Sequence, residues 1–204
     1  MIVKKFTYNI ENTKVFAPLK CGTRWLEKYT TPDNIEEIKH SDFLNIKTSN
    51  DICFLVYRDI KEHFVSALYT EYLWYNYNPI ENPKVFNTKK TKLNKIDFMK
   101  YKDFDLLFKK LTTVGGHYIP NFWESFYKKK NRNDFKLIHL NHLSSLFENP
   151  KTLYDKTEFD FSKEYLNQPK KEDVYNMLSS DQLDKLNKII EKETKYLNET
   201  ISVK

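Results

Sequence analysis

Glycine is scarce in this chain of 204 residues, which contains only three. One is Gly22, within KVFAPLKCGTRWL (14–26), and the other two are adjacent, within TVGGHYIP (113–120). Glycine allows a backbone to turn sharply or to approach a ligand closely. The positions of the glycines therefore single out these two stretches as candidates for special backbone geometry.

Arginine is scarce as well. The chain has 34 Lys and Arg residues, and only Arg24, Arg58 and Arg132 are arginine. The formal net charge of +6 suggests an anionic partner such as a nucleotide, a nucleic acid or an acidic glycan. Lysines scattered over solvated faces, as an AT-rich genome would encode, explain the same charge equally well.

Cysteines and long apolar runs are also few. Cys21 and Cys53 fit neither a disulfide framework nor a zinc site with paired spacing, which indicates a reducing compartment. Residues 1–12 lack the apolar region of a signal peptide, and no run approaches the ~18 apolar residues that cross a membrane. We therefore expect a soluble, cytoplasmic protein without a membrane span.

The composition indicates a folded protein, with 40% hydrophobic and 16% aromatic residues. The length suits a single domain over residues 1–204, and no internal repeat or linker divides it. Three short apolar runs predict strands at 14–17, 52–57 and 135–140. The run ICFLVY (52–57), bounded by polar residues, is typical of a parallel strand covered on both faces.

Helical patterns follow or separate these runs. The expected helices are 23–29, a helix capped by Asp59, 97–111, 143–147, and a long terminal helix behind a capping box of Ser179 and Gln182. Residues 76–96 are polar and predict a long surface excursion. Strands that alternate with helices predict an α/β domain with a central, mainly parallel sheet flanked by helices.

The first glycine lies where a strand, a tight loop and a helix follow one another. This arrangement aims backbone N–H groups at an anion. Lys20 supplies a mobile cation, and Gly22 permits close approach of the backbone. The stretch is no Walker A loop, because it lacks the Gly-Lys pair and the glycine five residues before it.

A second candidate anion site lies in YRDIKEHFVSALY (57–69). Arg58 ends the expected strand, and Ser66 lies two turns into the next helix. Arginine can bind a phosphate through a forked ionic contact and serine through its hydroxyl.

Together these stretches resemble the sulfotransferases that use 3′-phosphoadenosine 5′-phosphosulfate (PAPS). The 5′-phosphosulfate loop of that family reads roughly P-K-x-G-T-[ST]-W-L. The matching residues are Pro18, Lys20, Cys21, Gly22, Thr23, Trp25 and Leu26. Leu19 is inserted, and Arg24 replaces the usual Ser or Thr.

The 3′-phosphate motif of the same family reads roughly R-D-P-x-x-R-x-x-S-x-Y. The matching residues are Arg58, Asp59, Ser66 and, one place late, Tyr69. Ile60 replaces the proline, and His63 replaces the second arginine.

Two more segments are similar to the carbohydrate-type branch of this family. HYIPNFW (117–123) resembles a His-aromatic-x-Pro-Gln segment, with Asn121 in place of the glutamine. Residues 165–190 resemble the C-terminal loop and helix of the family. The four segments occur in the family's order along most of the chain.

The resemblance implies a three-layer, P-loop-like domain that takes PAPS as donor, releases 3′,5′-adenosine bisphosphate (PAP) and needs no metal. The acceptor would be a hydroxyl, with carbohydrate as a candidate class. The implied donor-binding residues are Lys20, Cys21, Gly22, Thr23, Arg24, Trp25, Arg58 and Ser66.

Two residues are the candidates for catalysis. Charge builds on the bridging oxygen as its bond to sulfur breaks, and Lys20 is the expected cation at that oxygen. His117 is the candidate general base, because histidine titrates near neutrality and the adjacent glycines allow an unusual approach. Glu71 is the reserve candidate.

Other interpretations remain open on the sequence alone. A kinase-like phosphotransferase using ATP and Mg²⁺ would need the missing Walker A loop. A non-catalytic module could hold a nucleotide or a nucleic acid through its lysines, although scarce arginine speaks against base readout, and we do not expect a nucleic-acid partner. Trp25 could be a core residue and His117 an ordinary loop histidine. Cys21 lacks a partner histidine in the local sequence, which argues against a nucleophile.

Overall fold

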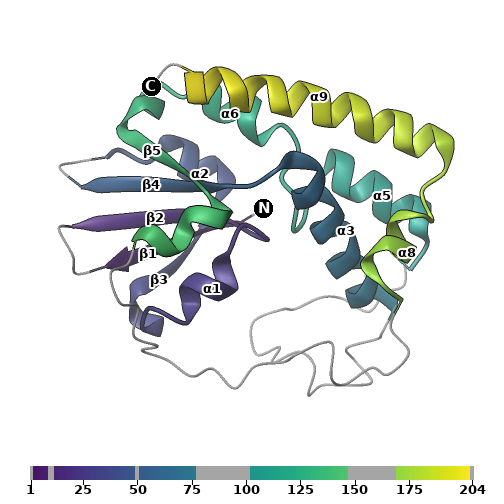
Figure 1. The fold of residues 1–204 in the computed structure, drawn as a ribbon, viewed down its shortest axis with the longest axis horizontal. Coiled ribbons are helices and arrows are strands. Elements are labelled where there is room, and N and C mark those ends of the chain that lie inside the picture. Colours follow the sequence, from purple (N-terminus) through teal and green to yellow (C-terminus); the bar gives the residue numbers. More distant parts are fainter. Residues whose placement is uncertain (1, 9–11, 49–50, 77–101, 147–168, 203–204) are drawn as a thin grey trace.

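A computed structural model describes residues 2–8, 12–48, 51–76, 102–146 and 169–202. The expected surface excursion, apart from its first residue, lies outside these ranges, as do residues 97–101 and 165–168 of other predicted segments. Within them the chain has an α/β fold, with one five-stranded sheet and helices around it (Figure 1). No helix in the described part is both long and apolar enough to cross a membrane.

The sheet is mixed, with strand order β3-β1-β2-β4-β5. Its strands are β1 (Ile2–Tyr8), β2 (Thr13–Pro18), β3 (Ile35–Lys39), β4 (Ile52–Tyr57) and β5 (Phe135–His139). β4 runs parallel to both β2 and β5, whereas β1 is antiparallel to both β2 and β3. The three strands expected from the sequence are confirmed and form the parallel part.

The expectation of a mainly parallel sheet is wrong for its other half. β1 and β3 were not expected as strands, because their apolar residues are interrupted by charges. β3 reads IEEIK, and only Ile38 in it is buried. The antiparallel half therefore carries a weak hydrophobic signal, and ion pairs such as Lys5–Glu36 join its strands across the surface.

From β2 onward, helices separate consecutive strands as expected, whereas β1 is followed directly by β2. They are α1 (Thr23–Glu27), η1 (Pro32–Asn34), α2 (His40–Asn45), α3 (Ile60–Asn76), α5 (Phe104–Thr113), α6 (Phe122–Tyr127), η2 (Arg132–Asp134), η3 (Leu140–Leu146), α8 (Lys171–Tyr175) and α9 (Ser180–Ser202). The short helix expected at 143–147 is a 3₁₀ helix that begins at Leu140.

Helix caps explain where the longer helices begin. The carboxylate of Asp59 accepts the Glu62 N–H at 2.9 Å, as expected for α3. Ser179 and Gln182 exchange the two hydrogen bonds of the predicted capping box before α9. The helix expected from residue 97 is described only from Phe104, where Asp103 caps α5.

Both faces of the sheet are packed. Successive side chains of a strand point to opposite faces, so neighbouring residues join different clusters. On one face, strand residues such as Phe16 and Leu55 join side chains of α2, α6 and α9. On the other face, Val15 and Val56 join side chains of α1 and η3. A third hydrophobic cluster joins α3, α5, α8 and α9 beyond the sheet. Figure 1 shows α9 extending from α6 across to α8.

Glu193 is a buried carboxyl between α9 and α6. It is 1% exposed, and its Oε2 accepts the Trp123 N–H at 2.8 Å. Its Oε1 has no hydrogen-bond partner among the described residues. Burial raises the pKa of Glu193 from 4.5 to about 7, so the folded state holds this proton more tightly than the unfolded state.

This raised pKa predicts a pH-dependent stability. Between pH 4.5 and about pH 7 the unfolded chain has released the proton that the folded chain retains, so stability falls as pH rises through this window. The loss should amount to about 3 kcal/mol. Urea denaturation of Glu193→Gln should show a flatter profile and higher stability at pH 8 than wild type. Parallel profiles for the two proteins would contradict the prediction.

Candidate functional site

A cavity of about 570 Å³ lies at the carboxyl ends of the parallel neighbours β2 and β4. This is the edge of an α/β sheet at which ligands commonly bind, and the volume suits a nucleotide-sized molecule. Its lining residues are Lys4, Leu19, Lys20, Gly22, Thr23, Arg24, Glu27, Arg58, Ser66, Tyr69, Thr70, Leu73, His117 and Leu140.

The fold brings most of the expected site residues to this cavity, from three distant parts of the chain. Those that line it are Lys20, Gly22, Thr23, Arg24, Arg58, Ser66 and His117. Parallel pairing of β2 with β4 explains why the residues after these two strands lie together, since Lys20 follows β2 and Arg58 follows β4.

Two expected donor-binding residues are not among the lining residues. Cys21 is 2% exposed within a hydrophobic cluster, and burial raises the pKa of its thiol to about 12. Trp25 packs on Tyr29 with ring centroids 4.3 Å apart and contacts the same cluster. The Cys21 side chain is therefore a protonated core group, and Trp25 is a half-buried residue that packs against the same core.

The loop after β2 has an unusual backbone. Lys20 and Gly22 both have left-handed conformations, with φ of 67° and 84°, and the Cys21 N–H donates to the Pro18 carbonyl at 3.0 Å. A Cβ on Gly22 would lie 2.7 Å from Cδ1 of Leu140. The left-handed conformation thus favours glycine here, and any other residue would also have to displace the Leu140 side chain.

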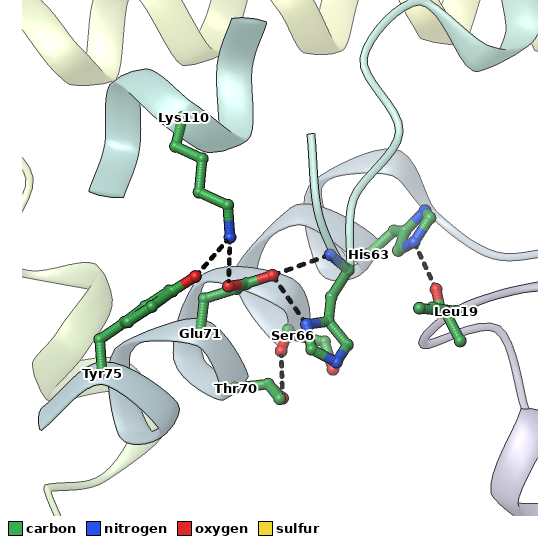
Figure 2. Close-up of polar contacts among 8 residues, drawn as sticks. Leu19, His63, Ser66, Thr70, Glu71, Tyr75 and Lys110 are labelled. Carbon is green, nitrogen blue, oxygen red and sulfur yellow. Dashed lines mark hydrogen bonds and ion pairs between the residues drawn. The ribbon is translucent and has the colours of Figure 1, made fainter. Parts of the chain in front are cut away.

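Side chains of the β4–α3 segment hold this loop through its backbone. Arg58 Nη1 donates to the Lys20 carbonyl at 3.0 Å. His63 Nε2 donates to the Leu19 carbonyl at 2.8 Å (Figure 2). Burial lowers the pKa of His63 to about 4, so its ring is neutral. His63, which replaces the motif's second arginine, therefore braces the loop without adding charge.

Lys20 is a poorly solvated cation. Burial first, and then the nearby Arg24, lower the pKa of Lys20 to about 8. An anion bound in the cavity would relieve both effects, because it would supply the missing counter-charge. This electrostatic setting favours an anionic ligand next to Lys20.

Arg58 forms a weak ion pair with Glu62. Its Nη2 donates to Glu62 at 2.9 Å, but the Glu62 side chain is 65% exposed, and such surface pairs contribute little. The Nε of Arg58 is buried and has no hydrogen-bond partner among the described residues. The guanidinium thus both holds the loop and presents a buried donor.

One face of α3 forms a wall of the cavity. Ser66, Tyr69, Thr70 and Leu73 line it, at the i, i+3, i+4, i+7 spacing of a single helix face. Thr70 and Leu73 were not expected from the sequence, although this spacing from Ser66 could have identified them. Lys4 and Glu27 were missed as well, because they come from the unexpected β1 and from the end of α1; they form an ion pair of 2.5 Å.

His117 reaches the cavity from the loop after α5, where the glycine pair lies. Gly115 has φ of 90° and donates its N–H to the Lys110 carbonyl at 2.8 Å, which ends the helix. The Nδ1 of His117 lies 2.8 Å from Oε1 of Glu71, and Lys110 Nζ donates to Oε2 at 2.8 Å. Figure 2 shows Glu71 with Lys110 and Tyr75 around it.

Glu71, Lys110 and His117 are three ionisable groups that perturb one another's pKa values. Burial would raise the pKa of Glu71, but the hydrogen bond and charge of His117, together with Lys110, outweigh it and lower that pKa to about 2. Burial also dominates at His117, whose pKa is lowered despite Glu71. At neutral pH the group therefore consists of an ionised Glu71, a charged Lys110 and a neutral His117.

No protein-family model matches the chain, and comparisons with curated proteins and with solved structures found no match either.

Proposed function

We propose that this protein is a PAPS-dependent sulfotransferase with a three-layer, P-loop-like domain. The observation that carries the proposal is the convergence of Lys20, Arg58 and His117 on one cavity of nucleotide size. Both cations come from the stretches that resemble the family's phosphate motifs, and packing on both faces of the sheet agrees with the implied layers.

The proposed donor site uses two sets of lining residues for the two phosphate groups. Lys20 and the loop at Gly22 and Thr23 would bind the 5′-phosphosulfate, while Arg58 and Ser66 would bind the 3′-phosphate. Arg24 adds a third cation to the lining. Three cations in one cavity lining suit a donor that carries more than one anionic group.

The proposed reaction moves an SO₃ group from the donor phosphate to an acceptor hydroxyl. The bond between sulfur and the bridging oxygen breaks, and its electron pair remains on the phosphate oxygen. Lys20 stabilises that developing charge. His117 takes the acceptor proton, because its neutral ring lines the same cavity.

Arg58→Ala tests the donor site. It should weaken PAP binding by roughly 1.5–3 kcal/mol, the contribution of a charge-assisted hydrogen bond. It should weaken 5′-AMP binding less, because that nucleotide loses only the support that Arg58 gives the Lys20 loop. Calorimetric titration of both nucleotides measures the difference, with Arg132→Ala as the control arginine outside the cavity. Equal losses for both nucleotides would remove Arg58 from the 3′-phosphate site. Tighter binding of ATP with Mg²⁺ than of PAP to wild type would favour the kinase-like alternative.

A further inference from the structure

His117 contacts a buried network of hydrogen-bonded side chains. Glu71, on α3, is 3% exposed. Its Oε2 accepts from Lys110 Nζ at 2.8 Å, and Lys110 also donates to the Tyr75 hydroxyl at 3.0 Å (Figure 2). Its Oε1 accepts two hydrogen bonds from His117, one from the backbone N–H at 3.0 Å and one from Nδ1 at 2.8 Å. Both oxygens of this carboxylate are thus engaged.

These contacts determine which nitrogen of His117 carries the proton. An ionised carboxylate can only accept hydrogen bonds, so Nδ1 must carry a hydrogen to contact Glu71. In a neutral ring the lone pair is then on Nε2. His117 lines the cavity, and Nε2 is the nitrogen of its ring that can accept a proton there.

Gly116 makes this arrangement sterically feasible. A Cβ at this position would lie 2.3 Å from Oε1 of Glu71, closer than real Cβ contacts allow. The atom it would displace is the one that accepts hydrogen bonds from the backbone N–H and from Nδ1 of His117. The second glycine of the pair therefore leaves the space that the Glu71 carboxylate occupies.

We propose that Glu71, anchored by Lys110 and accommodated by Gly116, is a positioning residue that fixes the proton of His117 on Nδ1. This inference rests on the proposed function. In the reaction, the acceptor O–H bond breaks, its proton binds Nε2, and its oxygen forms the new bond to sulfur. Glu71 then stabilises the resulting imidazolium, so it acts through His117 without contacting the substrate.

The charges that face His117 give this role a distinctive signature. Glu71 favours the imidazolium, whereas Lys20 and Lys110 oppose it, and the adjacent His63 is neutral. Glu71→Gln should therefore lower the pKa of His117, and Lys110→Met should raise it. A role limited to packing would not move this pKa in opposite directions.

Nitrogen-15 NMR of the histidine rings tests the proposal without requiring turnover. The chain has five histidines, and His117→Gln assigns the signal. Wild type should show His117 as the Nδ1–H tautomer when neutral. Glu71→Gln and Lys110→Met should shift its titration midpoint in opposite directions, and Gly116→Ala should reduce the Nδ1–H form. Glu193→Gln, which alters another buried glutamate, should change none of these signals.

Single-turnover rates provide the second readout. Glu71→Gln should slow sulfuryl transfer at least 10-fold while PAP binding stays within twofold, and Glu193→Gln should keep the wild-type rate. A wild-type His117 with its proton on Nε2, or unchanged ring signals in both Glu71→Gln and Gly116→Ala, would overturn the inference and leave the proposed function standing. Expected ring signals in a protein that transfers no sulfuryl group would overturn the proposed function and, with it, the catalytic part of this inference.

Discussion

Replacement of Lys20 by alanine is expected to lower kcat by about 10²–10³-fold, the effect of removing one preorganised donor from developing charge. Lys20 lines the cavity from a left-handed backbone position, and its ammonium is poorly solvated before the donor binds. The contact strengthens as the bridging oxygen gains charge, so turnover should suffer more than donor affinity.

Steady-state and single-turnover kinetics of Lys20→Ala compare its loss of turnover with its loss of donor affinity. Lys28→Ala is the matched control. This exposed lysine follows α1, the helix that Lys20 precedes, and does not line the cavity. Near-normal kcat with only a raised KM would mean that Lys20 merely holds the donor.

The second large effect is expected at His117. His117→Ala should lower kcat by about 10²-fold or more, because a positioned general base contributes ~10²–10⁴-fold. Donor binding should change little. In wild type, kcat should rise with pH through a midpoint below the usual histidine pKa, because burial disfavours the imidazolium.

The rate as a function of pH, measured in single turnovers, checks this prediction. His117→Ala should lose the acid-side limb of the profile. His139→Ala is a suitable control, since His139 is a histidine outside the cavity lining. A His117→Ala protein with the wild-type rate and profile would show that the base lies elsewhere. Glu71 would be a poor replacement, because its low pKa and its two engaged oxygens make it a weak base.

Much of the fold could be predicted where one physical signal dominates. The run at 52–57 matches β4 residue for residue, because a strand buried on both faces leaves an uninterrupted apolar pattern. The caps at Asp59 and Ser179 act within three residues and are equally local. β1 and β3 were not predicted as strands, because only a few of their side chains are buried and surface charges interrupt the alternation of apolar and polar residues.

The candidate site likewise has a part that the sequence predicts and a part that depends on tertiary packing. Proximity of Lys20 to Arg58 follows from parallel pairing of the strands that precede them, which the sequence indicates. The contact between Glu71 and His117 joins residues 46 positions apart, through a helix and a loop whose relative placement depends on tertiary packing. The sequence marked Gly116 as unusual, but only the structure identifies the carboxylate that needs its space.

The most direct test of the central claim is transfer of labelled sulfuryl from [³⁵S]PAPS to a panel of sugars, phenols and aliphatic alcohols. Wild type should form labelled product and PAP in equal amounts, without added metal, and Lys20→Ala should form at least 10²-fold less of both. The contradicting result is a folded wild-type protein that binds PAPS no better than 5′-AMP and transfers label to none of these acceptors.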